Sequence, residues 1–376
     1  MHRVFNTTLR VTFGCAVLGL AAATTAQADV TTTFSGFGTI GGTFTSNSDY
    51  AYHHDATEFS GASNQFGIPL ESRVGLQARF DFGDGLSVTA QEVFRLRETT
   101  NFDPGTEWLY VQYSPDPELQ VRLGRVVLAA FLYSDSRQVG YAMPWFRAPS
   151  EMYGSLPFDY LDGGQVLWQK SLGDFILNLE ASYGTTSGLF ELSATQVETT
   201  NAHDVLNAVV SVEYKNFLLR VARTNLSAPT SLPLTPTFSL NYAGHDYFTA
   251  VGFQYDDSKA LVIGEWSRSE QNLAPILNEP LSSSNQWYLT GGWHFGKFLP
   301  MVMYTKFNEQ KALVTPAAVN FGTWSGMLRY DVMTNVAVKA EISRPSASNG
   351  AYWIVGSNPT PNAHVNVYSV GVDFVF

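Results

Sequence analysis

The last twelve residues of the chain constrain its fold more than any other stretch. In residues 365–376, apolar side chains alternate with small or polar ones, so a strand formed here has one apolar face. The chain then ends on an aromatic ring, without the polar tail that usually follows the last strand of a soluble sheet. An apolar face that continues to the terminal carboxylate predicts that the last ring sits at a membrane interface. The apolar face carries Tyr368, Val370, Val372, Phe374 and Phe376.

The first residues have the parts of a secretory signal peptide. Two arginines give a basic start, and the apolar stretch 11–23 is too short to span a membrane as a helix. Ala26-Gln27-Ala28 is an A-x-A cleavage site, so we expect residues 1–28 to be removed after Ala28 and residues 29–376 to form one mature domain. The only cysteine, Cys15, leaves with this segment, and the mature chain therefore has no disulfides.

Sixteen segments near ten residues long are predicted as strands, joined alternately by tight turns and longer loops. An aromatic residue lies beside almost every tight turn, as in the interface girdle of a membrane barrel, whereas a secreted β-sandwich has no reason to place one there. The sequence thus predicts an all-β fold, a transmembrane antiparallel β-barrel of about 16 strands. The expected strands are 30–44, 70–82, 86–97, 107–114, 119–125, 164–171, 175–183, 205–214, 217–225, 244–255, 259–270, 285–295, 298–309, 321–330, 336–344 and 365–376.

With these strands in place, the chain resembles the Gram-negative general porins over its whole mature length. The resemblance implies a passive diffusion channel for small hydrophilic solutes and ions, in the outer membrane of a Gram-negative bacterium. It implies a homotrimer surrounded by outer-membrane lipid, and a third long loop, here 126–163, that folds into the barrel and narrows the pore. It also makes the terminal Phe376 part of the assembly signal. The matching residues are Ser72-Arg73-Val74-Gly75-Leu76, Asp84-Gly85-Leu86, Leu123-Gly124-Arg125 and Phe376.

The long loop departs from the general-porin pattern. In that family, an acidic motif on the loop faces arginines on the wall; Arg73 fits this cluster, but two further arginine positions fall near Glu107 and Asp162. The loop also carries eight aromatic rings, so a substrate-selective porin with an aromatic-lined constriction is an alternative function. The expected pore-constriction residues are Arg73, Arg79, Arg95, Arg97, Asp135, Glu151 and Asp159.

Strand parity assigns further cations to the inner wall. An arginine on the lipid face would cost about 2–4 kcal/mol at the membrane midplane, which favours a position in the lumen. The chain has a net charge of −11, and the acids of the long loop outnumber its arginines, so we expect a mild preference for cations that the wall cations oppose. The additional wall cations are Arg122, Arg220, Lys306, Arg329 and Lys339.

Several other functions are disfavoured. Gly36–Gly41 matches G-x-G-x-x-G, but it lies inside the first expected strand without a following helix, so we expect no cofactor and assign these glycines to packing against a neighbouring subunit. The histidines lack metal-ligand spacing, and the acidic balance argues against a nucleic-acid partner. No G-x-S-x-G occurs, and we expect no enzyme. An outer-membrane barrel hydrolase is the less favoured alternative, and it would need a serine, a histidine and an acid close together.

Overall fold

A computed structural model describes most of the expected mature chain. The expected signal peptide 1–28, its expected cleavage site and Arg97 lie outside the described residues. No helix within the described ranges is long and apolar enough to cross a membrane. The described residues are 30–54, 61–96, 102–154, 156, 158–193, 196–235, 238–272, 280–312, 320–347, 354–356 and 365–376.

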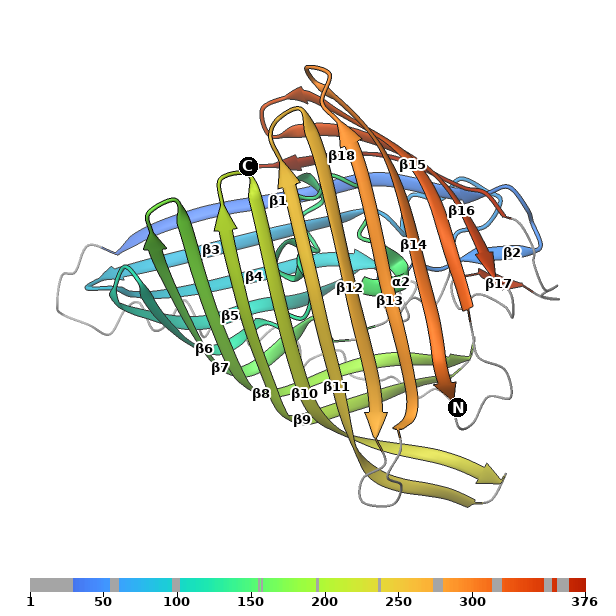
Figure 1. Ribbon diagram of the computed structural model, residues 1–376, viewed down its shortest axis with the longest axis horizontal. Coiled ribbons are helices and arrows are strands. Elements are labelled where there is room, and N and C mark those ends of the chain that lie inside the picture. The colour runs from blue at the N-terminus through green and yellow to red at the C-terminus, as the bar shows by residue number, and fades with distance from the viewer. Residues whose placement is uncertain are drawn as a thin grey trace, which may run out of the picture.

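Sixteen antiparallel strands form one closed barrel (Figure 1). Each strand pairs with its neighbours in sequence, and β1 closes the ring by pairing with β3 on one side and β18 on the other. The barrel strands are β1 (Thr31–Thr45), β3 (Arg73–Gly83), β4 (Leu86–Leu96), β5 (Phe102–Asp116), β6 (Leu119–Val127), β7 (Tyr160–Leu172), β8 (Phe175–Ser193), β9 (Gln196–Tyr214), β10 (Phe217–Thr235), β11 (Phe238–Asp256), β12 (Ala260–Asn272), β13 (Pro280–Trp293), β14 (Phe298–Ala312), β15 (Asn320–Met333), β16 (Val336–Ala347) and β18 (Val367–Val375).

The expected fold class, strand number and strand order are confirmed, but several strands are longer than expected. The stretches 184–204 and 226–243 were expected to be loops, whereas backbone pairing extends β8–β9 and β10–β11 through most of them. The prediction depended on an apolar face. A hairpin that extends beyond the membrane is held by backbone pairing and needs no lipid-facing side, so its sequence shows no alternating apolar face. In the loops at the same end, β2 (Tyr50–Tyr52) and β17 (Ile354–Gly356) form a separate two-stranded sheet.

The ends of the strands at the tight turns carry a girdle of rings on the outer surface. Phe175 and Tyr214 stack with their centroids 4.5 Å apart, and Phe298 and Tyr330 do the same. The rings face outward because the strand period places them with the lipid-facing side chains. The exposed rings of this girdle are Tyr113, Phe175, Tyr214, Phe217, Tyr255, Phe295, Phe298 and Phe376.

Glycine is required at two positions of β1 by contacts within the chain, whereas we expected these glycines to pack against a neighbouring subunit. A side chain at Gly36 would meet the Phe376 ring at 2.4 Å, and one at Gly38 would meet the Phe374 ring at 2.4 Å. The last two rings of the chain therefore lie across the glycines of the first strand. This contact is made within one chain, at the seam where the barrel closes.

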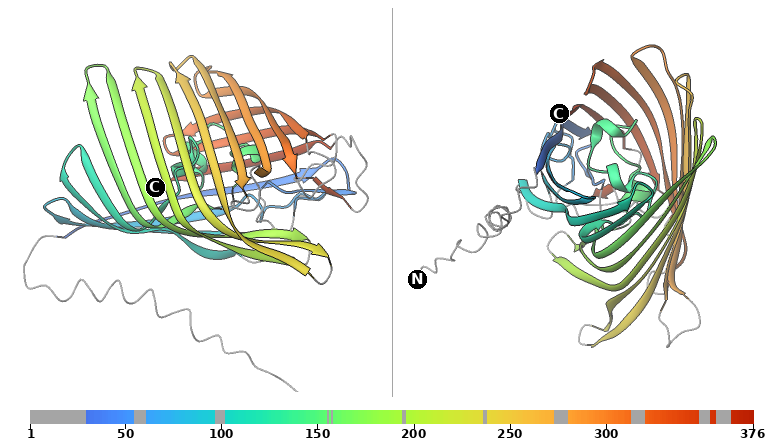
Figure 2. Two further views of the ribbon diagram at one scale, coloured as in Figure 1. Left: turned by 60° about the horizontal axis from the view of Figure 1, so that its bottom comes forward. Right: turned by 90° about the vertical axis from the view of Figure 1, so that its left-hand side faces the viewer.

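The long loop between β6 and β7 lies inside the barrel, as expected. Seen along the barrel, this segment sits within the ring of strands (Figure 2). Because β6 continues to Val127 and β7 begins at Tyr160, the loop is shorter at both ends than the expected 126–163. It contains three short helical turns, η2 (Ser134–Ser136), η3 (Gly140–Ala142) and α2 (Ser150–Tyr153).

Candidate functional site: the loop inside the barrel and the wall it faces

Apolar side chains hold one side of the loop against β12–β15. Trp145 is fully buried, its ring meets that of Tyr288 edge-on with centroids 5.5 Å apart, and its indole N–H donates to Thr290 Oγ1 at 2.9 Å. Methionines at 301, 303 and 327 complete this apolar contact from the inner wall. Most rings of the loop are thus buried between loop and wall, which disfavours the aromatic-lined constriction considered as an alternative. Tyr153 also lines the cavity described below. The buried loop rings are Phe131, Trp145, Phe146, Tyr153 and Phe158.

A buried lysine fastens the middle of the loop to β16. Lys339 is 1% exposed, and its Nζ lies 2.9 Å from an Asp373 carboxylate oxygen. The same amine donates to three loop carbonyls, which orients one whole turn of the loop. These carbonyls belong to Gly140, Met143 and Trp145, at 2.6, 2.7 and 2.8 Å.

Other inner-wall side chains bind the loop backbone in the same way. Arg220 Nη2 on β10 donates to the Ala129 carbonyl at 2.7 Å, and Arg329 Nη1 on β15 donates to the Tyr141 carbonyl at 2.9 Å. Glu265 on β12 accepts a hydrogen bond from the Leu132 amide at 2.7 Å. These wall charges do point inward, as strand parity predicted, but they fix the loop rather than line an open passage.

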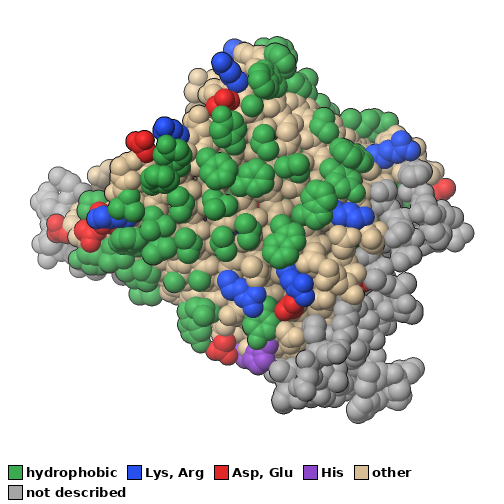
Figure 3. Space-filling model, viewed as in Figure 1, with side chains coloured by type: hydrophobic (Ala, Val, Ile, Leu, Met, Phe, Trp, Pro, Cys, Tyr) green, Lys and Arg blue, Asp and Glu red, His purple; other side chains and the backbone are tan. Residues whose placement is uncertain are grey.

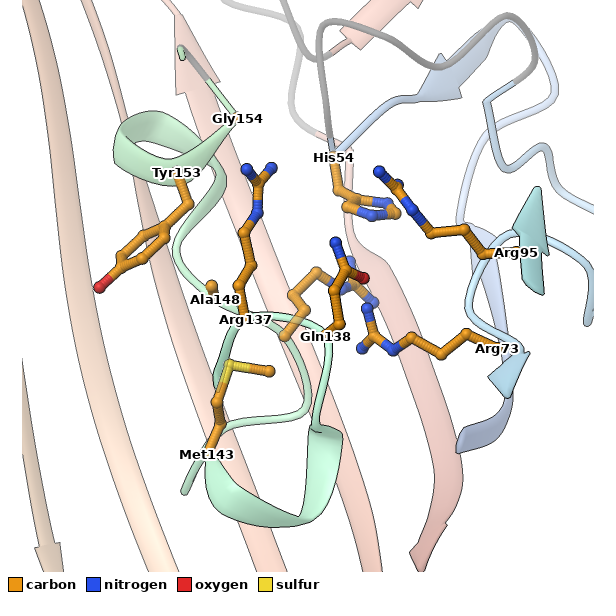
Figure 4. Close-up of a pocket in the computed structure, with 10 residues that line it drawn as sticks. His54, Arg73, Arg95, Arg137, Gln138, Met143, Ala148, Tyr153 and Gly154 are labelled. Carbon is orange, nitrogen blue, oxygen red and sulfur yellow. The ribbon is translucent and has the colours of Figure 1, made fainter. Parts of the chain in front are cut away.

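Two arginines of the loop face the wall formed by β3 and β4, where a cavity separates loop and wall (Figure 4). Arg137 and Arg147 reach this cavity from the loop, and Arg73, Arg95 and His54 reach it from the other side. Arg73 and Arg95 are directly paired across β3 and β4, which places both guanidinium groups on one patch of the inner wall. We call the space between them the basic cavity. It is lined by His54, Arg73, Arg95, Arg137, Gln138, Met143, Arg147, Ala148, Tyr153 and Gly154.

Two acids meet the arginines of the basic cavity. Asp159 binds Arg137 through one carboxylate oxygen, and its other oxygen lies 3.4 Å from Nη2 of Arg95. Glu71, which precedes β3, lies 2.9 Å from Nη2 of Arg147. Four arginines therefore line this cavity, and these two acids form ion pairs with three of them.

The expected constriction residues divide into two groups. Arg73, Arg95 and Asp159 come together at the basic cavity. Arg79 lies six residues further along β3, close to its turn, where it pairs with Asp81 at 3.7 Å.

Asp135 and Glu151 have no ion pair with the arginines of the basic cavity, unlike the expected arrangement. Asp135 is exposed in η2. Glu151 is 4% exposed and turns away from the arginines, because α2 packs on β13 and β14 and its carboxylate accepts a hydrogen bond from Thr323 Oγ1 on β15. Burial raises the pKa of Glu151 above its ordinary value.

Sequence reasoning gave no site role to several residues that the structure brings to the basic cavity. Arg137 and Arg147 were counted only as charges of the loop, and His54 only as a residue of a polar loop. The presence of two arginines on a loop expected to be acidic could have pointed to Arg137 and Arg147. Glu71 and the apolar faces of β12–β15 left no such signal, because their roles depend on where the loop docks.

Other chemistry is weakly supported. Among the described residues, no group of three or more His, Cys, Asp and Glu side chains could hold a metal ion. Ser227 lies 3.1 Å from Nδ1 of His245, but Asp204 pairs with a different histidine, His203, at 2.8 Å. At these two pairs, the hydrogen bonds do not connect a serine, a histidine and an acid in series, as nucleophilic catalysis requires.

Comparisons with known proteins agree with this architecture. A sequence model described as Gram-negative porin matches residues 14–350. No curated protein matches the chain. OmpT of Vibrio cholerae superposes with a TM-score of 0.60 at 15% identity, over 92% of this chain and 98% of that one. An anion-selective porin from Comamonas acidovorans gives 0.57 at 12% identity, over 93% and 100%, and OmpF of Salmonella typhi gives 0.56 at 10%, over 92% and 97%.

Proposed function

The chain belongs to the Gram-negative porin family. We propose that its channel prefers small anionic solutes and that these solutes pass the long loop at the basic cavity. It is a passive channel of the outer membrane for small hydrophilic solutes. The basic cavity is the single observation that carries the proposed preference. Selectivity follows from the charges at the narrowest part of a pore, not from the charge of the whole chain.

The local charges oppose the cation preference suggested by the net charge of the chain. Of the three loop acids expected at the constriction, Glu151 is buried against the far wall, and Asp159 sits between two arginines. Glu71 meets Arg147, but Arg73 has no ion pair with a described acid and its Nε has no hydrogen-bond partner there. Two further acids, Asp373 and Glu341, act on Arg73 and Arg147, and Asp373 is itself paired with Lys339. The cations still outnumber the acids, and we propose that this leaves a positive potential where loop and wall approach each other.

Both sides of the basic cavity supply cations. This differs from the general-porin arrangement, in which the loop supplies acids and the wall supplies arginines. An anion between Arg73 on the wall and Arg137 on the loop would be attracted from two directions. A cation on the same path would meet like charge on both sides, and we propose that this asymmetry sets the preference.

A salt gradient across a planar bilayer tests the proposal with the purified mature protein. We expect the reversal potential to have the sign of anion preference, and the double variant R73Q/R137Q to move it towards cations. R79Q removes one positive charge from the same face of β3, away from the basic cavity, and should move the reversal potential by well under half as much as the double variant. A cation-preferring wild type, or equal shifts for the two variants, would contradict the proposal. Absence of any conductance would instead count against the channel itself.

We also propose that the barrels associate as a homotrimer and work without catalysis. One solved form of Vibrio cholerae OmpT, a structural neighbour, is a trimer. The outer surface near β1 is strongly apolar, with Phe34 75% and Ile40 60% exposed, which suits either lipid or a neighbouring subunit. Native mass spectrometry in detergent should detect three copies, and a stable, active monomer would exclude the trimer. Esterase assays on the same preparation should show no turnover.

A further inference from the structure

A histidine lies among the arginines of the basic cavity. His54 lines the cavity together with Arg73, Arg95, Arg137 and Arg147, and among the described histidines it is the only one that does so (Figure 4). Histidine is the side chain whose ordinary charge change falls between pH 5 and 8, whereas guanidinium groups stay charged throughout this range. The arginines therefore give the cavity a fixed charge, and His54 can add a charge that depends on pH.

The segment that carries His54 is fixed to the long loop by the residue two positions before it. Within this segment β2 pairs with β17, and Tyr52 exchanges two backbone hydrogen bonds of 2.8 and 2.7 Å with Ala62. The Tyr52 hydroxyl lies 3.0 Å from Ser150 Oγ, and the guanidinium group of Arg147 lies 5.3 Å from the centre of its ring. Side chains two positions apart in an extended chain lie on the same side, and Tyr52 and His54 both reach the long loop.

The other described histidines lie away from the basic cavity. His53 is 9% exposed and packs on the opposite side of its segment, where a side chain at Gly61 would meet its ring at 2.7 Å. His294 follows the end of β13 at a tight turn. His203 and His245 are exposed next to buried inner-wall residues, so they belong to the outer surface, which hydrophobic side chains largely cover (Figure 3).

Charged groups from the wall and from the loop face His54. Glu71, just before β3, and Glu341 on β16 interact electrostatically with it. These acids favour a proton on the ring, and the arginines oppose it. Two of the neighbours keep their charge state between pH 5 and 8. Burial acts to raise the pKa of Glu71, but the charge of Arg147 holds it below its usual 4.5, and burial raises the pKa of Tyr52 to about 12. The groups that face His54 are Tyr52, Glu71, Arg73, Arg95, Arg137, Arg147 and Glu341.

We propose that His54 determines how the ion preference of the channel depends on pH, and that its protonation makes the channel more selective for anions in acid. The proposal rests on the proposed passage of solutes at the basic cavity. A fifth positive charge there attracts a passing anion more strongly and repels a passing cation. A unit charge about 4 Å from an ion is worth about fivefold in relative permeability in water.

Reversal potentials in a salt gradient test the proposal, with the mature protein in planar bilayers at pH 8 and pH 5. We expect the anion-to-cation permeability ratio of wild type to rise from pH 8 to pH 5, and H54N to lose about fivefold of this rise. H54K carries a fixed charge, so its ratio at pH 8 should already be about fivefold above that of wild type. The controls H53N and H294N keep His54 and should retain the wild-type rise. Heat-modifiable migration in electrophoresis shows that each variant has folded.

The outcomes separate the role of His54 from the preference for anions. An H54N variant with the same rise as wild type would overturn the proposal, and so would an H54K ratio at pH 8 equal to that of wild type. A loss of the rise in H53N as large as in H54N would also overturn it, because the effect would then belong to the segment and not to the charge of His54. A wild type that prefers cations at both pH values, while H54N and H54K change the ratio as expected, would support the role of His54 and contradict the preference for anions.

Discussion

Arg147 of the long loop and Glu71 of the wall form an ion pair, with 2.9 Å between Nη2 and Oε1, and neither side chain is more than 6% exposed. The same arginine contacts Thr43 and Ser369 through Nη2, so one guanidinium group joins the loop to β1, β18 and the approach to β3. Removing one partner of a buried pair typically costs about 3–5 kcal/mol, because the other charge is left without compensation. The position of the loop therefore depends on this contact.

The Glu71–Arg147 pair should make loop position sensitive to acid. Burial alone would raise the pKa of Glu71, but the charge of Arg147 and the hydrogen bond from Thr43 outweigh it, and the pKa lies below its usual 4.5. A lowered pKa contributes stability that is present above the unfolded value and lost as pH falls through the folded value. We expect single-channel conductance to become noisier below about pH 4.5. E71Q should be noisy already at pH 7, and identical noise in wild type and E71Q would contradict the prediction.

Neutralising Asp159 should change ion selectivity, and neutralising Glu151 should not. A unit charge about 4 Å from a passing ion is worth about 1 kcal/mol in water, or about fivefold in relative permeability. D159N removes an acid that meets two arginines, so its reversal potential should shift towards anions. E151Q changes a loop residue that is buried against the far wall, and it serves as the matched control. A larger shift for E151Q would place the ion path on the other side of the loop.

The buried carboxylate of Glu151 should reduce stability as pH rises. Because burial raises its pKa, the folded protein binds a proton more tightly than the unfolded chain, and stability falls with rising pH between the two pKa values. E151Q can keep the contact with Thr323 and has no charge to bury. Thermal unfolding followed from pH 5 to 8 should therefore show a flatter pH profile for E151Q. Parallel pH profiles of wild type and E151Q would mean that ionisation of this carboxylate does not lower the stability of the folded protein.

Lys339 should hold the loop against the wall. K339M removes the donor that Asp373 and three loop carbonyls share. Thr39 still donates to Asp373, and Arg329 still donates to the Met143 carbonyl. The cost is about 1–3 kcal/mol for each buried group that stays unsatisfied. We expect a higher and less uniform single-channel conductance in a barrel that still folds. K170M removes a half-buried lysine that pairs with Glu118 far from the loop, and it should conduct like wild type. An unchanged conductance of K339M would show that the apolar contacts hold the loop unaided.

Deletion of Phe376 should impair assembly of the barrel. Its backbone exchanges two hydrogen bonds of 2.9 Å with Gly36, and its ring covers that glycine. Each backbone bond contributes about 1 kcal/mol, and both lie at the closing seam. The folded, heat-modifiable fraction in outer membranes should fall in the deletion variant and be retained in F376Y. Wild-type levels after deletion would remove the proposed role in assembly.

Much of the barrel could be predicted because its determinants are local. Alternating side chains and rings beside tight turns repeat along the chain, and each repeat reports one strand without reference to any other. The hairpin ends of β8–β11 were missed because backbone pairing beyond the membrane needs no apolar face. Lys306 was expected in the lumen, but it faces outward, because Thr305 and Phe307 on either side of it are buried on the inner side. The alternating pattern misplaced it because a strand whose inner side is covered by the loop is apolar on both faces.

The sequence by itself determined the class of the protein: the strand number and order, the loop that enters the barrel and the membrane that surrounds it follow from period-two patterns and from the resemblance that they support. Only the tertiary structure decided which charges meet. Glu151 and Asp159 are equivalent as loop acids, yet one is buried against Thr323 and the other bridges Arg95 and Arg137. The physical reason is that a residue's charge belongs to the sequence, whereas its partners, burial and distance to a passing ion depend on how the loop docks, which non-local packing determines.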